Sequence, residues 1–163
     1  MRRWYLTASA KQPKVAVSAS LAGPAAAVVA IQDRPRDTET AIDAMQLVLA
    51  YTAEFQGNIG DTLTDPAYAA KVLNTLSLIS RQIDIAEHAD ATAILTVEND
   101  NGEHVAYTIA SLKAGAIYYE AMCRIADNPK RSIKLLEQVL ELTPDAAHAH
   151  FGIGMLNAEM LNK

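Results

Sequence analysis

Residues 135–154 of this 163-residue sequence read LLEQVLELTPDAAHAHFGIG. Apolar residues recur at helical spacing up to Leu142, and a second apolar segment follows Pro144. A proline is well tolerated at the first position of a helix, so Pro144 after Thr143 predicts the start of a new helix. Two amphipathic helices joined by so short a turn pack as antiparallel neighbours. The stretch therefore predicts a helical hairpin.

Asn128-Pro129 repeats the same start signal upstream. The C-terminal part of the chain is therefore predicted to contain three helices, at 112–126, 129–142 and 144–161. Short turns separate them, so each is expected to lie antiparallel to the next.

The stretch 135–154 resembles the junction between two tetratricopeptide repeats. In that family a 34-residue unit of two antiparallel helices ends near a proline, and the next unit carries a small residue at its eighth position. Pro144 corresponds to the proline, Gly154 to the small residue, and Leu136 to a large apolar position of the second helix. The resemblance covers residues 113–161.

Upstream of the junction the match is poorer. Tyr119 fits the apolar seventh position, but Glu120 stands where a small residue is usual. Ser132 and Val139 replace two further small residues of the family pattern. A single repeat cannot bury its own apolar face, so the helices predicted within 38–88 are expected to act as its structural neighbour.

The family's groove is lined by the first helix of each unit. Carried over position by position, the resemblance implies a partner-binding groove formed by Ile117, Tyr118, Ala121, Arg124, His148, Phe151 and Met155. The clamp that some family members use for a terminal carboxylate is absent, apart from Arg124. A groove of this composition implies an apolar or helical ligand, or another part of the same chain.

Two further amphipathic helices are predicted at 38–57 and 65–88. A loop at 57–64, with two glycines, separates them. Asp65-Pro66 starts the second helix with an N-cap and a proline at the first helical position. Both helices must bury an apolar stripe.

Residues 93–109 carry the best strand signal. Asp100-Asn101-Gly102 suits a three-residue hairpin loop whose last position needs a positive φ, which glycine adopts at no steric cost. The resulting register pairs Ala93 with Ile109, Leu95 with Tyr107 and Val97 with Val105 on one face, and Glu98 with His104 on the other.

A long helix is the alternative for the same residues. Val105, Ile109 and Leu112 also fit helical spacing, which would extend the helix at 112–126 back to Glu103. Register, turn chemistry and residue pattern agree in the hairpin, and such agreement favours it. The predicted fold is mainly α-helical, with this β-hairpin between the helices.

Residues 1–37 are predicted to form an N-terminal arm, separate from a helical domain at 38–163. Apolar and other residues alternate over 4–21, which indicates a β-hairpin, although the many small residues weaken the signal. The segment 25–31 fits either a third strand or a short helix.

The sequence RRWYL at 2–6 resembles the twin-arginine export signal, with Val15–Ala30 as the apolar region. Lys11 and Lys14 interrupt the start of that region, and Pro24 breaks it again. The segment is also too short for a transmembrane helix. We expect a cytoplasmic protein, with export through this N-terminus as the alternative.

Half of the residues are apolar and a fifth are charged, as in an ordinary globular protein. The net charge of −5 provides no general attraction to nucleic acid or anionic lipid. The single cysteine, Cys123, excludes an internal disulfide and fits a reducing compartment. Cys123 lies on the apolar stripe of its helix, which predicts a buried and inert thiol.

Candidate chemical sites are few. His148 and His150 lie two positions apart on a helix and point in different directions, which favours solvated or groove-lining side chains over metal ligands. Asp84, Glu87 and His88 are interpreted as a solvated helix end. The sequence contains no nucleophile elbow, phosphate-binding glycine loop or paired cysteines, and we predict no catalytic residue, metal or cofactor.

Arg124, Lys130, Arg131 and Lys134 form a basic cluster near a helix N-terminus. An anion or acidic peptide fits such a cluster, because backbone donors also point outward there. A solvated basic face is the simpler interpretation.

Three functions remain from the sequence. The first is a non-catalytic protein-interaction or assembly-scaffold module that uses an apolar groove. The second is a structural subunit of a homo-oligomer or larger complex, and the third is a small-molecule-binding domain or enzyme. A protein or peptide partner, or self-association, is expected, without nucleic acid and without a membrane span.

Overall fold

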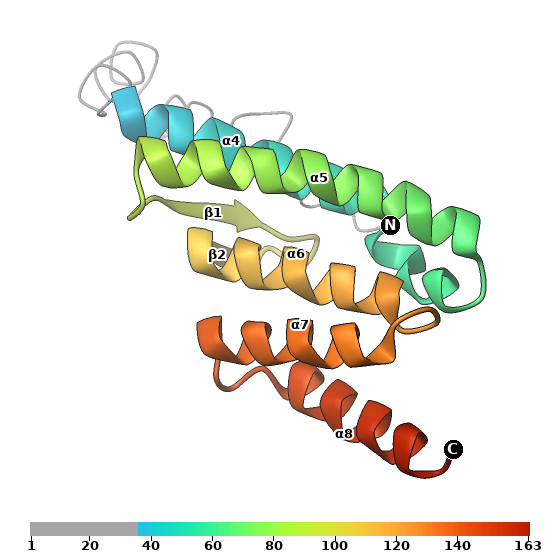
Figure 1. Ribbon diagram of the computed structural model, residues 1–163. Coiled ribbons are helices and arrows are strands. Elements are labelled where there is room, and N and C mark those ends of the chain that lie inside the picture. The colour runs from blue at the N-terminus through green and yellow to red at the C-terminus, as the bar shows by residue number, and fades with distance from the viewer. Residues whose placement is uncertain (1–35) are drawn as a thin grey trace. The chain divides into compact units, whose positions relative to one another are not determined.

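The computed structural model describes residues 36–163. These residues form six helices and a two-stranded antiparallel sheet, so the predicted mainly α-helical fold with one β-hairpin is confirmed (Figure 1). The predictions for the N-terminal arm (strands, a short helix or an export signal) fall almost entirely outside the described residues. No helix in the described part combines the length and the apolar character needed to cross a membrane.

The elements are α4 (Arg36–Ala53), the 3-10 helix η1 (Gln56–Leu63), α5 (Pro66–Ala89), β1 (Ile94–Glu98), β2 (His104–Thr108), α6 (Ile109–Arg124), α7 (Pro129–Leu142) and α8 (Ala147–Leu161) (Figure 1). The described residues divide into two compact units. One holds 36–54 and 81–109, and the other holds 55–80 and 110–163. The single helical domain predicted at 38–163 thus includes residues of both units.

The first unit is built on α4, the last part of α5 and the hairpin. Two acidic residues lie in the first turn of α4, where carboxylates interact favourably with the helix dipole. α4 packs against β1, whose Leu95 and Val97 are buried on one face. α4 ends at Ala53, before the stop that the sequence pattern places at Gly57.

Asp90 connects the start of α4 to the end of α5. The Thr38 hydroxyl donates to Oδ2 of Asp90 at 2.6 Å. The hydroxyl and N–H of Thr92 donate to Oδ1 at 2.7 and 3.0 Å. The bond from Thr38, and then those from Thr92, stabilise the carboxylate and hold the pKa of Asp90 below its ordinary value of 3.8.

Replacing Thr38 by valine is expected to lower stability in a pH-dependent way. Because the folded pKa of Asp90 is lowered, its contribution is present above the ordinary value and is lost as the pH falls through the folded value. Urea unfolding should therefore show a difference between wild type and Thr38→Val at about pH 7 that shrinks towards about pH 2.5.

The matched control is Thr75→Val, since the Thr75 hydroxyl bonds only to the backbone oxygen of Lys71 in its own helix. Its effect on the urea midpoint should be independent of pH. An equally pH-independent effect of Thr38→Val would contradict the role given to Asp90.

The hairpin has the predicted register. Leu95 pairs with Tyr107, Val97 with Val105, and Glu98 with His104. The Asn99 N–H bonds to the Glu103 oxygen at 2.9 Å and encloses a three-residue loop, in which Gly102 has a φ of 78°. The long-helix alternative is wrong, because 104–108 is a strand and α6 begins only at Ile109. The predicted pair of Ala93 and Ile109 lies beyond the ladder.

Two predicted helix starts are confirmed. Oδ1 of Asp65 accepts from the Tyr68 N–H at 3.1 Å, ahead of α5. Oδ1 of Asn128 accepts from the Arg131 N–H at 3.1 Å, with Pro129 at the first position of α7. In both cases the cap satisfies a backbone donor that has no partner within its helix.

The predicted loop at 57–64 is wrong, because η1 occupies Gln56–Leu63. The Thr62 side chain is buried, and its hydroxyl donates to the Ile59 oxygen at 2.6 Å. Burial of Thr62 gives this short segment a packed side, which its polar and glycine-rich composition does not indicate.

The predicted start of the last helix at Pro144 is also wrong. The Thr143 N–H bonds to the Val139 oxygen at 2.8 Å and completes α7. The Ala146 N–H then bonds to the Thr143 oxygen at 3.1 Å, which makes Pro144 part of a turn. Consequently α8 begins at Ala147.

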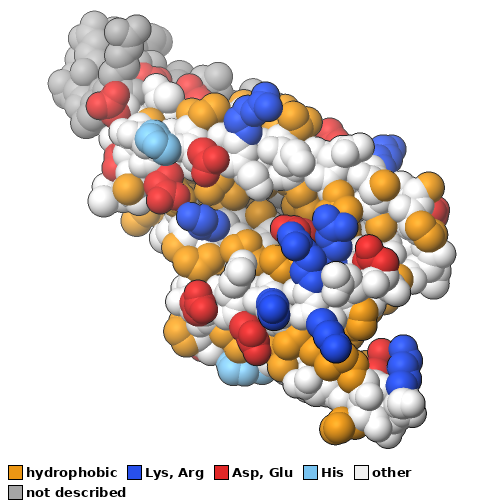
Figure 2. Space-filling model, viewed as in Figure 1, with side chains coloured by type: hydrophobic (Ala, Val, Ile, Leu, Met, Phe, Trp, Pro, Cys, Tyr) orange, Lys and Arg blue, Asp and Glu red, His pale blue; other side chains and the backbone are white. Residues whose placement is uncertain are grey.

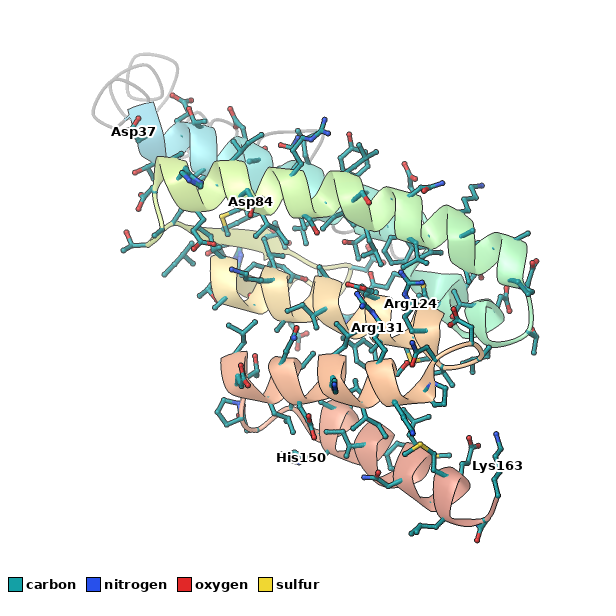
Figure 3. All side chains as sticks on the ribbon, in the orientation of Figure 1. Asp37, Asp84, Arg124, Arg131, His150 and Lys163 are labelled. Atoms are coloured by element: carbon teal, nitrogen blue, oxygen red, sulfur yellow. The ribbon has the colours of Figure 1, made fainter. Side chains whose placement is uncertain are left out.

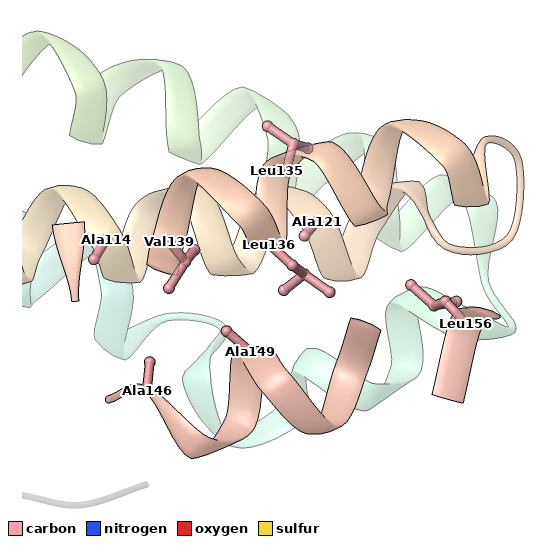
Figure 4. Packing of buried hydrophobic residues seen from close by; sticks show 8 residues of the cluster. All are labelled: Ala114, Ala121, Leu135, Leu136, Val139, Ala146, Ala149 and Leu156. Carbon is pink, nitrogen blue, oxygen red and sulfur yellow. The ribbon is translucent and has the colours of Figure 1, made fainter. Parts of the chain in front are cut away.

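The core of the second unit lies between α6, α7 and α8 (Figure 4). Its buried apolar cluster consists of Ala114, Ala121, Leu135, Leu136, Val139, Ala146, Ala149 and Leu156. The buried Ser132 hydroxyl donates to the Ala121 oxygen at 2.8 Å, which joins α7 to α6. Small residues on facing helices permit this close approach.

α8 lies tightly against α7 at Gly152. A Cβ placed on Gly152 would lie 3.0 Å from Cδ1 of Leu136. The tetratricopeptide pattern assigns the small residue to Gly154, but a Cβ there would meet no atom within 4 Å. Of these two glycines, the one that has no room for a side chain is therefore Gly152 and not the one in the pattern.

Candidate functional site

The predicted groove residues on α6 have different environments. Ile117 and Tyr118 are half-buried and pack against the apolar cluster. The Tyr118 ring meets the His148 ring edge-on, with centroids 4.5 Å apart and an interplanar angle of 87°. This contact joins α6 to α8, which are the two helices that the family resemblance assigns to the groove.

Ala121 does not belong to an open groove. Its exposed fraction is 0%, and it lies inside the cluster shared with α7. A side chain without exposed surface is not accessible to a partner, so the prediction for Ala121 is wrong. The physical reason is the close approach of α7, held by the bond from Ser132 to the Ala121 backbone oxygen.

α8 is apolar on two opposite faces. Ala149 and Leu156 point into the cluster. On the other side, apolar residues recur at helical spacing and are all exposed: Ala147, Phe151, Met155, Ala158 and Leu161. We call these five residues the outer face of α8. Phe151 is 70% exposed and Met155 is 50% exposed, and Figure 2 shows hydrophobic side chains at the surface over α7 and α8.

Arg124, the remaining predicted groove residue, lines a pocket that faces α5. This pocket has a volume of about 220 Å³. Its lining consists of Leu73, Asn74, Leu76, Ser77 and Ser80 from α5, with Glu120 and Arg124 from α6. All of these residues belong to the second unit.

Two arginines of the basic cluster, Arg124 and Arg131, have different partners. Arg131 donates to Oε1 of Glu120 at 3.2 Å, across from α7 to α6 (Figure 3). Nη1 of Arg124 lies 4.0 Å from Oδ2 of Asp127, and its buried Nε has no hydrogen-bond partner among residues 36–163. Arg124 thus lines the pocket, and its buried Nε donates no hydrogen bond to a described residue.

The thiol of Cys123 is buried, as predicted. Burial raises the pKa of Cys123 to about 11, against a smaller opposite effect of Arg124. The thiol is therefore protonated at neutral pH, and a protonated thiol is a poor nucleophile. Burial also raises the pKa of the neighbouring Tyr68, with further contributions from Asp61 and Cys123.

The histidines contact different partners. His148 packs on Tyr118, whereas Nε2 of His150 lies 2.9 Å from the Pro144 oxygen. Nδ1 of His88 lies 2.8 Å from the backbone oxygen of Asp84 within one helix end. Within residues 36–163, no group of three or more His, Cys, Asp or Glu side chains has a metal-binding arrangement.

Comparisons with known proteins give no match to a family model, to a curated protein or to a solved structure. The tetratricopeptide resemblance therefore stays a prediction from the sequence. The outer face of α8 and the Arg124 pocket are left as the two candidate sites.

The residues of α5 that line the pocket were not among the site residues predicted from the sequence. Asn74, Ser77 and Ser80 recur every three residues, so they follow one side of α5. This row of small polar residues along one side of α5 is a pattern that the sequence alone could have shown. Only the packing of α6 shows that the row faces Glu120 and Arg124.

Proposed function

We propose that this protein is a non-catalytic protein-interaction or assembly-scaffold module whose partner binds the outer face of α8. The observation that carries the proposal is that α8 is apolar on two opposite faces. One face is packed on α7, and no described residue covers the other.

An amphipathic surface helix normally presents polar residues to water. A helix that is apolar all round is normally buried, and an exposed apolar patch typically marks an interaction site. Phe151 and Met155 belong to the residue types that are enriched at protein interfaces. The composition of the outer face of α8 therefore supports a protein partner.

The interface must extend beyond these five side chains. A stable complex buries roughly 800 Å² on each partner, more than one narrow helix face provides. His148, in contact with Tyr118, lies beside the outer face on α8 and supplies an aromatic margin. The polar Asn157 and Glu159 are exposed on the same helix and suit the rim of an interface.

The proposed binding surface keeps only part of the groove that the tetratricopeptide resemblance implies. The contact between Tyr118 and His148 brings α6 and α8 together, in agreement with a groove formed by the first helix of each unit. Ala121 is left out because it is buried, and Arg124 is left out because it lines the pocket facing α5.

Self-association is the second candidate, and the charge of the surface favours it. The outer face of α8 contains no charged residue. Two copies of the chain can therefore meet through this face about a twofold axis without burying like charges against each other. In that case the protein is a structural subunit of a homo-oligomer.

The double substitution Phe151→Ser and Met155→Ser tests both candidates. Both side chains are largely exposed, so we expect a nearly unchanged unfolding midpoint in urea. Loss of two apolar anchors should weaken association tenfold or more, which is a typical effect at an interface hot spot. Light scattering at about 10–100 µM measures self-association, and affinity capture from the native cell measures retention of a partner.

Leu78→Ser is the matched control, because Leu78 is an exposed leucine on α5, away from α8. It should leave self-association and capture unchanged. The proposal would be refuted if the wild-type protein is monomeric and if the wild type and the double variant capture the same proteins. Equal effects of Leu78→Ser and the double variant would show that α8 has no special role.

A further inference from the structure

Gly154 is exposed on the same side of α8 as the outer face, three residues after Phe151 and four before Ala158. A glycine inside a helix is less favourable than alanine, because it loses more conformational freedom on folding. The contact with Leu136 explains Gly152, whereas a Cβ on Gly154 would meet no atom of the described residues within 4 Å. Packing within the described chain therefore gives no reason for a glycine at 154. Glycine is the residue that lets a partner come close to a helix backbone.

The large and small residues around Gly154 fit a second copy of α8 that runs in the opposite direction. In an antiparallel pair centred between residues 153 and 154, position 151 of one helix lies opposite position 156 of the other. Residues four apart are neighbours on a helix surface, so this point lies between Gly154 and Ala158. The large Phe151 side chain of each copy then fits over the two small residues of the other. Because such a pair has twofold symmetry, this contact occurs twice.

The polar residues beside the outer face are complementary in the same arrangement. His148 and Glu159 flank the outer face on one side of α8, and His150 and Asn157 flank it on the other. In the antiparallel pair each flank meets the same flank of the second copy, so His148 lies opposite Glu159 and His150 opposite Asn157. The outer face itself contains no charged residue, so no like charges meet there. A parallel pair would place equal helix ends side by side, where their partial charges repel each other.

We infer that the partner of the outer face of α8 is a second copy of this chain, bound through an antiparallel pair of α8 helices that cross at Gly154. The inference rests on the function proposed above and names the occupant of the same surface. An interface made of one helix from each copy is small, and small interfaces are typical of weak, reversible association. The dimer is therefore best detected by trapping it with a covalent bond.

Disulfide cross-linking between engineered cysteines of the full chain tests both the partner and its direction. Ala147→Cys and Ala158→Cys each place an exposed thiol at one end of the outer face. In the antiparallel pair position 147 lies beside position 158 of the other copy, whereas each position lies roughly 14 Å or more from its own counterpart. A disulfide needs Cα atoms within about 7 Å. Under mild oxidation, a mixture of the two variants should therefore form cross-linked dimer about tenfold faster than either variant alone.

Two controls and one further substitution accompany the measurement. The wild type reports on the native Cys123, which is buried, and Leu78→Cys mixed with Ala147→Cys reports on random encounters of exposed thiols. Gly154→Leu, added to both cysteine variants, occupies the place of the Phe151 ring of the other copy and should slow cross-linking about tenfold or more. The unfolding midpoint in urea should not fall, because a Cβ at 154 meets no atom within 4 Å among the described residues.

Three results would overturn the inference. They are cross-linking of the mixture no faster than the Leu78→Cys control, cross-linking of Ala147→Cys with itself as fast as in the mixture, and unchanged cross-linking after Gly154→Leu. The function proposed above still holds in each of these cases if the double variant at Phe151 and Met155 loses a protein that the wild type captures. The two experiments therefore fail separately.

Discussion

Leu136→Ala is expected to lower the free energy of unfolding by about 2–5 kcal/mol, the range for a buried leucine truncated in a packed core. Leu136 is 2% exposed and lies in the cluster shared by α6, α7 and α8. Its Cδ1 packs at the place where a Cβ on Gly152 would come within 3.0 Å. Because α8 approaches α7 so closely there, the helices cannot easily move to fill the space left by the missing atoms.

Urea unfolding, followed by circular dichroism, measures the effect as a lower midpoint at a similar slope. Leu142→Ala is the matched control, since Leu142 lies on the same helix but is 38% exposed. Its expected cost is about 1 kcal/mol or less. Equal midpoints for Leu136→Ala and the wild type would mean that the Leu136 side chain of α7 is not buried.

Gly102→Val should destabilise the hairpin by about 1–3 kcal/mol, the cost of holding a non-glycine residue in a sparsely populated backbone region. The φ of Gly102 is 78°, and a β-branched side chain resists this conformation. A Cβ at this position would meet only Oε1 of Glu98, at 3.7 Å, which is an ordinary contact distance. The expected loss therefore comes from the backbone conformation and not from a clash.

Gly102→Asn separates these two causes. Asparagine tolerates positive φ far better than valine, although its side chain is of similar size. We expect Gly102→Asn to retain most of the stability that Gly102→Val loses, with hydrogen exchange of the strand amides as the local readout. Equal destabilisation by the two substitutions would mean that backbone conformation is not the cause.

Signals between residues close in the sequence predicted much of the fold. Asp65 and Asn128 each cap a helix by accepting from an N–H three residues later. Gly102 supplies the positive φ of the hairpin loop, and the register of β1 and β2 follows from that loop. Such interactions act over a few residues, so the local sequence contains all the groups that take part.

Pro144 shows where local signals become ambiguous. Proline is favoured both at the first position of a helix and shortly after the end of one. The sequence pattern predicts a helix start at Pro144, whereas in the structure Thr143 completes α7 and α8 begins at Ala147. The sequence around Pro144 fits both arrangements.

The sequence by itself determined the helical class, the hairpin with its register, and the apolar residues that require cover. The tertiary structure alone decided which side of each helix remained accessible. Ala121 and Arg124 lie three residues apart on α6, yet one is sealed by α7 and the other lines a pocket facing α5. The physical reason is that burial depends on which helix packs against each side. Helical spacing places residues on a common face but does not name the neighbour that covers it.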